Sequence, residues 1–186
     1  GKIMNELKKH GIDDSTLVLF VGDNGTNSRL ISQTIYGPVK GGKGNTITHG
    51  INVPMVAYWP SIIQNNKTYD GLINFNDFYA TFTDILNVAN DSDGKSMMDI
   101  FSGEKQLMRD IVTIYYDSKW GKNKYRNVFS QNKKYKLYKN GNFFNMEKDV
   151  LETSPLLDHE LSNEEKSIKK QLAFELNNFP DLPSVK

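Results

Sequence analysis

The sequence predicts an α/β protein in two parts, and three observations carry this prediction. The apolar run from Thr16 to Val21 has the length and the branched side chains of a strand buried on both faces, as in a parallel sheet. Helical periodicity flanks this run over residues 2–10 and 77–88. The last third of the chain instead carries short aromatic-rich segments, which are typical of an antiparallel sheet. We therefore expect an α/β domain over residues 1–105 and a small antiparallel β subdomain with a C-terminal helix over residues 106–186.

Local signals set the limits of the elements in the first part. The helix over residues 2–10 ends at Gly11, since glycine readily adopts the left-handed conformation at a helix stop. A long polar loop follows the first strand and runs to about Thr48. A second short strand, Val53 to Pro60, is closed by its proline. Asn76 is placed to cap the helix over residues 77–88. The predicted apolar face of that helix consists of Phe78, Phe82, Ile85 and Leu86.

The second part contains stronger signals. Residues 111–116 are rich in β-formers. The dipeptide Asn140-Gly141 lies between two aromatic-rich segments, and Asn-Gly tolerates the positive φ angles of a tight hairpin turn. Ser162 and Glu165 have the spacing of a capping box for a final helix, which Pro180 ends. The apolar positions of this helix are Ile168, Leu172 and Leu176.

Composition excludes several classes of function. The chain has 186 residues, of which 38% are apolar and 24% charged, so a folded core is expected rather than disorder. The formal net charge of +1 argues against a dedicated nucleic-acid-binding protein. The absence of cysteine excludes disulfides, thiolate zinc sites and cysteine catalysis. No apolar run approaches the roughly 18 residues of a membrane-spanning helix.

The triplet Asp23-Asn24-Gly25 follows the first predicted strand, at the carboxyl end where α/β sheets bind ligands. A carboxylate beside an amide oxygen offers two hard oxygen donors, which suit Ca²⁺ or Mg²⁺. A plain turn containing asparagine and glycine explains the same three residues. The triplet by itself leaves both interpretations open.

A second candidate is the segment Gly41-Gly42-Lys43-Gly44, which places one cation among three glycines. Without Cβ atoms, backbone N–H groups can approach an oxyanion closely, and Lys43 adds a positive charge. The spacing is not that of a Walker motif, and an ordinary surface loop has the same composition. His49 follows in a loop before the second strand, where a surface role and a substrate-binding role both remain open.

The stretch from Lys119 to Lys139 contains eight basic residues and no acidic one. Trp120, Tyr125 and Tyr135 lie among these bases. This pattern is compatible with binding of a polyanion, but it favours the solvated face of a hairpin.

Order and spacing together add a resemblance to a known family. The stretch from Asp13 to Pro60 resembles the sulfatases, the arylsulfatase branch of the alkaline-phosphatase-like superfamily. Weaker similarity continues in the helix over residues 77–88, in Lys136-Leu137 and in Asn145 to Asp149. The segments that carry the resemblance are Asp14-Ser15-Thr16-Leu17-Val18-Leu19-Phe20, Asp23-Asn24-Gly25, Gly42-Lys43-Gly44-Asn45-Thr46, Gly50-Ile51-Asn52-Val53-Pro54 and Trp59-Pro60.

The resemblance implies the C-terminal portion of an alkaline-phosphatase-like sheet and a hydrolase of sulfate esters. It implies that Asp23 and Asn24 are calcium ligands, that Asp23 also helps to orient or deprotonate the nucleophile, and that Lys43 contacts the sulfate. His49 stands where the family usually has Glu or Gly, and Asn52 where it has Arg. Both positions are expected near the substrate, so the sulfated small molecule or sulfated glycan is not specified.

The family nucleophile is a formylglycine made from Cys or Ser in a Cys/Ser-x-Pro-x-Arg motif, and this sequence contains no such motif. We therefore expect the chain to be the C-terminal part of a sulfatase. The whole enzyme is expected to be periplasmic or secreted, and the 186 residues alone are expected to be inactive. Twenty lysines against three arginines, together with twenty asparagines, suggest a bacterial source.

Two alternatives stay open. One is a phosphoester hydrolase or phosphotransferase of the same superfamily, which uses two zinc ions; Asn24 argues against it, because an amide oxygen suits calcium better than zinc. The other is a non-catalytic module that binds sulfated glycans through Trp120, Tyr125 and the basic stretch over residues 119–139.

Overall fold

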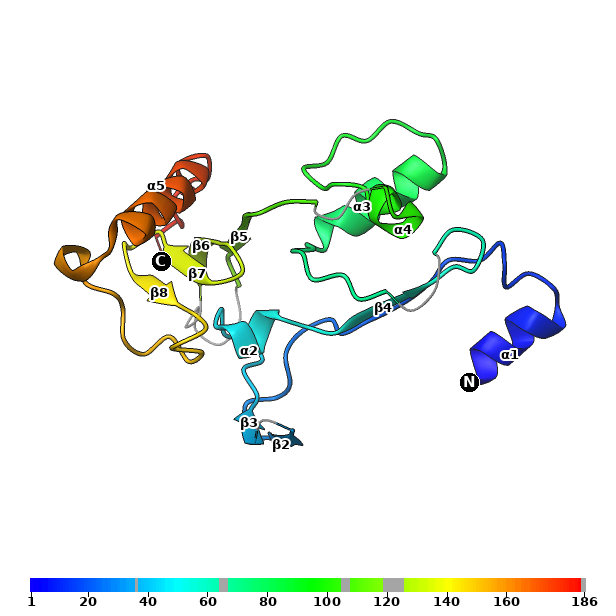
Figure 1. Ribbon diagram of the computed structural model, residues 1–186, viewed down its shortest axis with the longest axis horizontal. Coiled ribbons are helices and arrows are strands. Elements are labelled where there is room, and N and C mark those ends of the chain that lie inside the picture. Colours follow the sequence, from blue (N-terminus) through cyan, green and yellow to red (C-terminus); the bar gives the residue numbers. More distant parts are fainter. Residues whose placement is uncertain (36, 64–66, 105–107, 119–125, 185–186) are drawn as a thin grey trace. The chain divides into compact units, whose positions relative to one another are not determined.

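The computed structural model describes residues 1–35, 37–63, 67–104, 108–118 and 126–184. The chain divides into two compact units, each formed by segments that are separate in the sequence (Figure 1). The first unit comprises residues 1–21 and 54–110. The second comprises residues 22–53 and 111–186. No helix in the described ranges has both the length and the apolar character that crossing a membrane requires.

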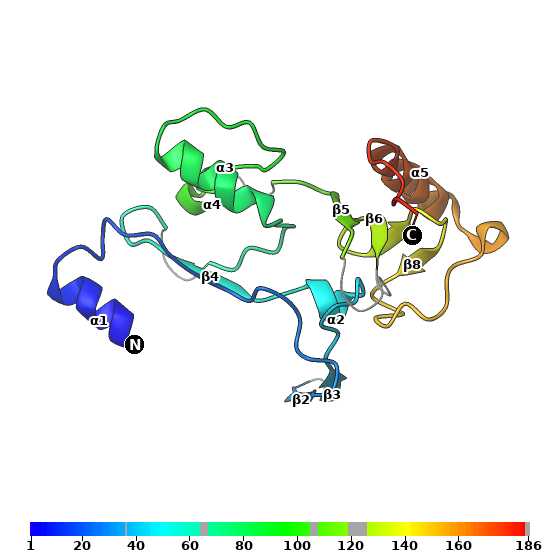
Figure 2. The ribbon, with the colours of Figure 1, turned by 180° about the vertical axis from the view of Figure 1, so that it is seen from behind.

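The first unit begins with α1 (Lys2–Lys9), which ends as expected. Gly11 has a φ of 65°, and the N–H of Ile12 bonds back to the carbonyl of Leu7 at 3.1 Å, which closes the helix end. The unit also contains β1 (Val18–Val21), β4 (Met55–Tyr58), α3 (Asn76–Ile85) and α4 (Met98–Ser102), seen from behind in Figure 2.

The expectation that the first strand is buried in a parallel sheet is wrong. β1 pairs antiparallel with β4, Val18 opposite Tyr58 and Val21 opposite Met55. Phe20 on β1 remains 72% exposed and Val56 on β4 61% exposed. A parallel partner is usually reached through a crossover helix that packs on the sheet, whereas the connection between these strands contains a hairpin and a four-residue helix and belongs to the second unit.

Helix α3 is shorter than predicted, and a different face of it is buried. It spans Asn76–Ile85, so Asn76 is its first residue rather than its cap, and no side chain caps its start. Phe82, Ile85 and Leu86 are 46%, 37% and 70% exposed. The buried positions are Asp77, Ala80, Thr81 and Thr83.

The buried face of α3 contains polar side chains, and groups from neighbouring segments form hydrogen bonds with them. The carboxylate of Asp77 accepts the N–H groups of Asn74 at 2.7 Å and of Lys95 at 2.8 Å, and it pairs with Arg109. Thr81 accepts the N–H of Met97 at 2.9 Å. Burial of polar groups is tolerated here because each of these groups has a hydrogen-bond partner.

The second unit is built on a four-stranded antiparallel sheet, ordered β5-β6-β7-β8. Its strands are β5 (Val112–Tyr116), β6 (Asn127–Gln131), β7 (Tyr135–Tyr138) and β8 (Phe143–Asn145). The predicted hairpin is confirmed: Leu137 lies opposite Phe143, and Gly141 in the turn has a φ of 93°.

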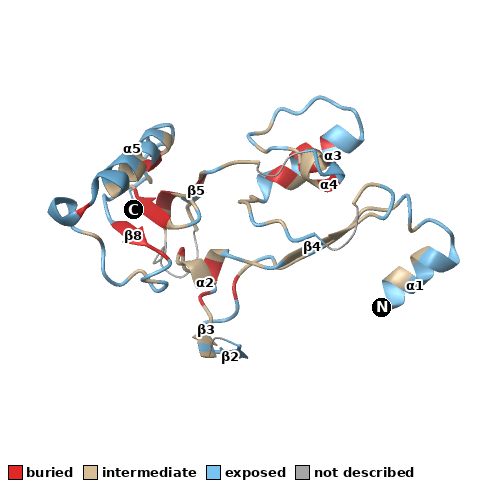
Figure 3. Cartoon of the chain, viewed as in Figure 1, coloured by how far each residue is buried: buried red, intermediate tan, exposed pale blue. Residues whose placement is uncertain are grey.

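Much of this sheet is buried (Figure 3), and its side chains alternate between two apolar clusters on opposite faces. On one face, α5 (Asn163–Asn177) packs its Leu172 and Leu176 into an apolar cluster. The sheet residues of that cluster are Val128, Tyr135, Leu137 and Phe143. On the other face, Phe129, Tyr138 and Phe144 form a second cluster, against which Ile51 packs from the segment over residues 22–53. The sheet therefore carries α5 on one side and this earlier segment on the other.

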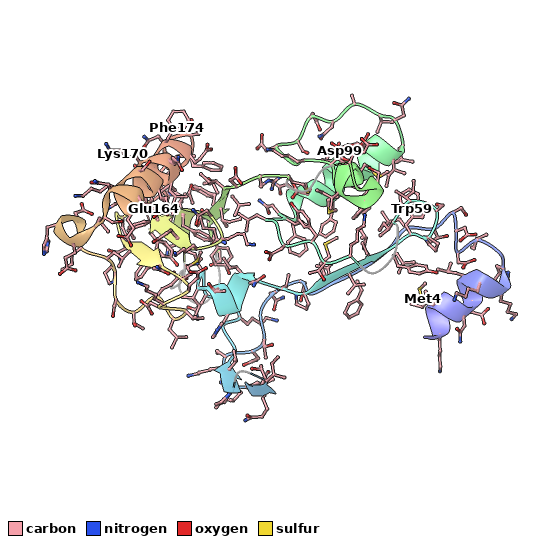
Figure 4. The ribbon with its side chains drawn as sticks, viewed as in Figure 1. Met4, Trp59, Asp99, Glu164, Lys170 and Phe174 are labelled. Carbon is pink, nitrogen blue, oxygen red and sulfur yellow. The ribbon has the colours of Figure 1, made fainter. Side chains whose placement is uncertain are left out.

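Helix α5 begins at the predicted capping box. The hydroxyl of Ser162 accepts the N–H of Glu165 at 3.2 Å, and the carboxylate of Glu165 accepts the N–H of Ser162 at 2.9 Å. Figure 4 shows Lys170 and Phe174 on the side of α5 that faces away from the sheet; Lys170 agrees with the amphipathic pattern, whereas Phe174 is an exposed apolar exception to it. A 3₁₀ turn, η2 (Asp158–Glu160), precedes the helix.

The capping box makes the start of α5 sensitive to acid. The N–H and then the hydroxyl of Ser162 hold the pKa of Glu165 below its ordinary value of 4.5. Because the pKa of Glu165 is lower in the folded than in the unfolded protein, its contribution to stability is present above pH 4.5. That contribution is lost as the pH falls through the pKa of Glu165 in the folded protein. We expect the amide protons of the first turn of α5 to lose protection, measured against the intrinsic exchange rate at each pH, as the pH falls below 4.5. Glu165→Gln keeps an oxygen acceptor but does not titrate, so its exchange should lose this acid dependence; an unchanged dependence would contradict the assignment.

The segment over residues 22–53 is more structured than the predicted loop. It contains an antiparallel hairpin of β2 (Ile31–Thr34) and β3 (Gly37–Lys40), in which Ile31 lies opposite Lys40. It ends in a short helix, α2 (Thr48–Ile51). The hairpin was missed because β2 is exposed along its whole length and so lacks an alternating apolar pattern.

Candidate functional site

Two glycine-containing segments of the second unit lie against each other through their backbones. The N–H of Gly25 donates to the carbonyl of Gly50 at 3.0 Å, and the N–H of Lys43 donates to the carbonyl of Thr26 at 2.9 Å. The first segment carries the Asp23-Asn24 pair and the second carries Lys43. The structure therefore brings together the two segments on which the sequence places candidate site residues.

Glycine is required for this close approach. A Cβ atom on Gly25 would lie 2.1 Å from the carbonyl oxygen of His49, and one on Gly50 would lie 2.2 Å from that of Asn45. A Cβ on Gly42 would meet the backbone nitrogen of Gly50 at 2.8 Å. Because these neighbours are backbone atoms, a side chain at Gly25 would push the two segments apart, and one at Gly42 or Gly50 would force open the loop that carries Lys43.

We therefore expect Gly25→Ala to destabilise the second unit by roughly 1–3 kcal/mol, the range typical of overpacking, because the new methyl group meets a rigid carbonyl. Urea unfolding measures this loss. Gly11→Asn is the matched control, since no atom lies within 4 Å of its Cβ position and asparagine tolerates a φ of +65°. A Gly25→Ala protein as stable as this control would show that the close contact is not needed.

The predicted site residues differ in burial. Asp23 and Lys43 are exposed, whereas Asn24 is half-buried. Asp23 and Lys43 thus present their charges to solvent from adjoining backbone segments. An exposed carboxylate and ammonium on a closely packed glycine framework are available to a ligand.

His49 lies in α2 rather than in a loop. Its Nδ1 atom is 3.1 Å from the carbonyl oxygen of Lys40. A carbonyl oxygen only accepts hydrogen bonds, so Nδ1 carries the proton, and the lone pair of the neutral ring is on Nε2. The contact holds the ring against the end of β3.

The metal-binding capacity of the described residues is limited to a partial shell. No group of three or more His, Cys, Asp or Glu side chains is arranged to hold a metal ion in the ranges that the structure describes. Asp23 and Asn24 supply hard oxygens of the kind that calcium prefers, but calcium takes six to eight oxygen ligands. The donor chemistry fits calcium, provided that further ligands come from elsewhere.

The residues that anchor this site to the sheet were not predicted from the sequence. Thr46, three residues after Lys43, is buried and contacts the sheet. Its backbone carbonyl accepts the Nζ of Lys136 at 2.7 Å, and its hydroxyl lies 3.2 Å from the hydroxyl of Tyr138. Alternation along β7 places Lys136 on the face opposite to Tyr135 and Leu137, where a lysine is expected to be exposed, so no local signal indicated its burial.

Several basic residues of the stretch over residues 119–139 do not face solvent. Lys136 is fully buried, and Lys139 donates to the carbonyls of Leu176 and Phe179 at the end of α5. Arg126 pairs with Asp117 at 2.5 Å. Trp120 and Tyr125, which the glycan-binding alternative requires, lie outside the described residues.

Comparison with known proteins finds similarity to sulfatases. The sequence model of the sulfatase family matches residues 1–88, which include both glycine segments. A sulfatase of Formosa agariphila is 27% identical over an alignment 206 residues long that covers 96% of this chain. The chain is similar to the sulfatase family over these residues.

Other sulfatases show the same relation over shorter stretches. The uncharacterized sulfatase YdeN of Escherichia coli is 33% identical over 115 residues, which cover 56% of this chain. The chain spans only 19% of the length of YdeN and 36% of the length of the Formosa protein.

Solved structures support the fold assignment. BT4656, solved in complex with its substrate D-glucosamine-2-N,6-O-disulfate, superposes with a TM-score of 0.72 at 19% identity, over 96% of this chain and 36% of its own. The structure called Ps i-CgsB, in complex with k-i-k-neocarrahexaose, gives a TM-score of 0.66 at 22% identity, over 96% of this chain and 39% of its own. The predicted relation to sulfatases, with mixed α/β structure, small antiparallel sheets and a C-terminal helix, is confirmed.

Proposed function

We propose that this chain is the C-terminal part of a sulfatase, and that it supplies Lys43, Asp23 and Asn24 to a site that hydrolyses sulfate esters. The observation that supports this most directly is the packing of the Gly25 and Gly50 backbones, which joins the Asp23-Asn24 turn to the Lys43 loop. The match of the sulfatase family model to residues 1–88 and the exposure of Asp23 and Lys43 support it further.

Each residue has a distinct role in this proposal. The ammonium of Lys43 contacts a sulfate oxygen and stabilises the negative charge that develops as the S–O bond to the alcohol breaks. Asp23 and Asn24 hold calcium through their side-chain oxygens, and Asp23 also orients or deprotonates the nucleophile. A calcium ion bound there supplies positive charge to the sulfate oxygens. The nucleophile, a formylglycine, comes from a part of the enzyme outside these 186 residues.

His49 is the candidate for substrate selection. Its Nδ1–H is committed to the carbonyl of Lys40, so Nε2 is the atom that can meet the alcohol portion of a substrate. BT4656 and Ps i-CgsB were solved with a disulfated glucosamine and a neocarrahexaose, respectively. We propose a sulfated glycan as the substrate class, with a small sulfate ester as the alternative, in a bacterial enzyme that is periplasmic or secreted.

Turnover of a chromogenic aryl sulfate and of sulfated glycans tests the proposal. The full gene product should release sulfate in a calcium-dependent manner, whereas the 186 residues alone should release none. Release of phosphate from an aryl phosphate, together with zinc in the purified protein, would instead favour the phosphoesterase alternative. Turnover by the 186 residues alone would show that no further part is needed.

A further inference from the structure

The second unit contains a buried charged cluster that the proposed chemistry does not use. Lys136, in the middle of β7, is fully buried. Its Nζ lies 4.8 Å from the centre of the Phe129 ring and 5.6 Å from that of Tyr138. The ammonium therefore occupies a position on the sheet that an apolar side chain would fill in a core selected for stability alone.

The cluster is closed by Glu152 and Tyr138. The Nζ of Lys136 donates to one carboxylate oxygen of Glu152 at 2.6 Å, and the Tyr138 hydroxyl donates to the other. Side-chain exposure is 0% for Lys136 and 2% for Glu152. Burial lowers the pKa of Lys136, although the Glu152 carboxylate acts in the opposite direction, and burial raises the pKa of Tyr138.

Glu152 reaches this position with an unusual backbone. Its φ is 54°, in the left-handed region that side chains other than glycine rarely adopt. Glycine would occupy this conformation with less strain, so the requirement at this position is for the carboxylate and not only for the turn.

Lys136 and Tyr138 both contact Thr46, which lies in the glycine loop (residues 42–50). The carbonyl of Thr46 accepts the Lys136 ammonium at 2.7 Å, and the Thr46 hydroxyl meets the Tyr138 hydroxyl at 3.2 Å. The amide of Asn127, on β6, reaches the same hydroxyl at 3.4 Å. A charged donor on a carbonyl gives a short, directed bond, so the loop is fixed at a defined height above the sheet.

Backbone hydrogen bonds on both sides of Thr46 connect it to the candidate site residues. Towards the N-terminus, the N–H of Asn45 bonds to the carbonyl of Gly42 at 2.8 Å, which closes the turn that carries Lys43. Towards the C-terminus, Gly50 bonds to Gly25 at 3.0 Å and so fixes the turn after Asp23 and Asn24. We propose that Lys136, together with Glu152 and Tyr138, is a positioning residue that holds the loop over residues 42–50 and thereby presents Lys43. The effect on catalysis rests on the proposed function, whereas the effect on the loop does not.

Hydrogen exchange of the full gene product, read by mass spectrometry, tests the effect on the loop. Lys136→Met removes the ammonium and keeps the chain length. We expect at least a tenfold faster exchange in peptides that cover residues 42–51, without an equal change in α5. Lys139→Met is the matched control, because the Lys139 Nζ bonds to the end of α5; it should speed exchange there and leave residues 42–51 unchanged.

A double variant separates loss of the loop anchor from general unfolding of the protein. Lys136→Met leaves the Glu152 carboxylate buried without its cation, whereas Lys136→Met combined with Glu152→Leu leaves no buried charge. The double variant should fold and still show faster exchange in residues 42–51. Exchange that is unchanged, or that rises equally throughout the second unit, in the double variant would overturn the proposal.

A double-mutant cycle tests the effect on catalysis. If Lys136 acts through Lys43, Lys136→Met should lower kcat at least tenfold in the wild-type background and less than twofold in a Lys43→Ala background. Equal slowing in both backgrounds would overturn the catalytic part of the proposal. If the unmodified gene product has no sulfatase activity, the proposed function fails, and the exchange experiment alone decides whether the cluster holds the loop.

Discussion

Lys43→Ala should lower the kcat of the full sulfatase by about 10²–10³-fold with little change in its melting temperature, the effect typical of removing one donor that stabilises transition-state charge. Lys43 is exposed, and its N–H rather than its side chain bonds to Thr26, so the loop should keep its structure without the ammonium. Steady-state kinetics on an aryl sulfate, with thermal unfolding of the same samples, separate the two effects.

Lys40→Ala provides the matched control for this experiment. Lys40 is also exposed and lies in the same segment, at the end of β3, but it is outside the glycine turn. Its removal should change kcat less than twofold. If Lys43→Ala and Lys40→Ala have the same rates as the unmodified enzyme, Lys43 does not contact the sulfate.

The second large effect concerns the stability of the first unit. Asp77→Ala should lower the free energy of unfolding by about 3–5 kcal/mol, because it leaves the Arg109 guanidinium without its carboxylate in a nearly closed environment. The substitution also removes the acceptor of the N–H groups of Asn74 and Lys95. Urea unfolding gives this difference directly.

Two further variants define what Asp77 contributes. Asp77→Asn retains one oxygen acceptor, so its loss of stability should be smaller than that of alanine. Asp91→Ala is the surface control, since Asp91 is exposed and its contact with the Tyr79 hydroxyl is 3.3 Å long. A loss below 1 kcal/mol for Asp77→Ala, equal to that of the control, would show that the buried network is not important for stability.

Short-range signals predicted the C-terminal part of the chain well. Asn140-Gly141 gave the hairpin and Ser162 with Glu165 gave the start of α5, because turn geometry and helix capping depend on residues only a few positions apart. The Asp23 and Lys43 segments were also found from their glycines and charges. Their assignment as site residues remains a prediction.

Long-range pairing was the part that the sequence did not reveal. An apolar run such as that of β1 indicates that a strand is stabilised by burial, but it does not identify the partner strand. The apolar stripe of α3 pointed to Phe82 and Leu86, whereas a network through Asp77 and Arg109 decided which face is buried. Lys136 was read as part of a basic surface because its partner, Glu152, is 16 residues away.

The sequence by itself determined the resemblance to sulfatases, the turn and cap residues, and the glycines and charged residues of the two candidate segments, since all of these depend on residue type and local spacing. The tertiary structure alone decided that those segments meet, that the antiparallel sheet is covered by α5 on one side and by the glycine loop on the other, and that a buried lysine anchors the loop. The physical reason is that hydrogen bonds and close backbone contacts between distant segments depend on three-dimensional distance, which local sequence patterns do not encode.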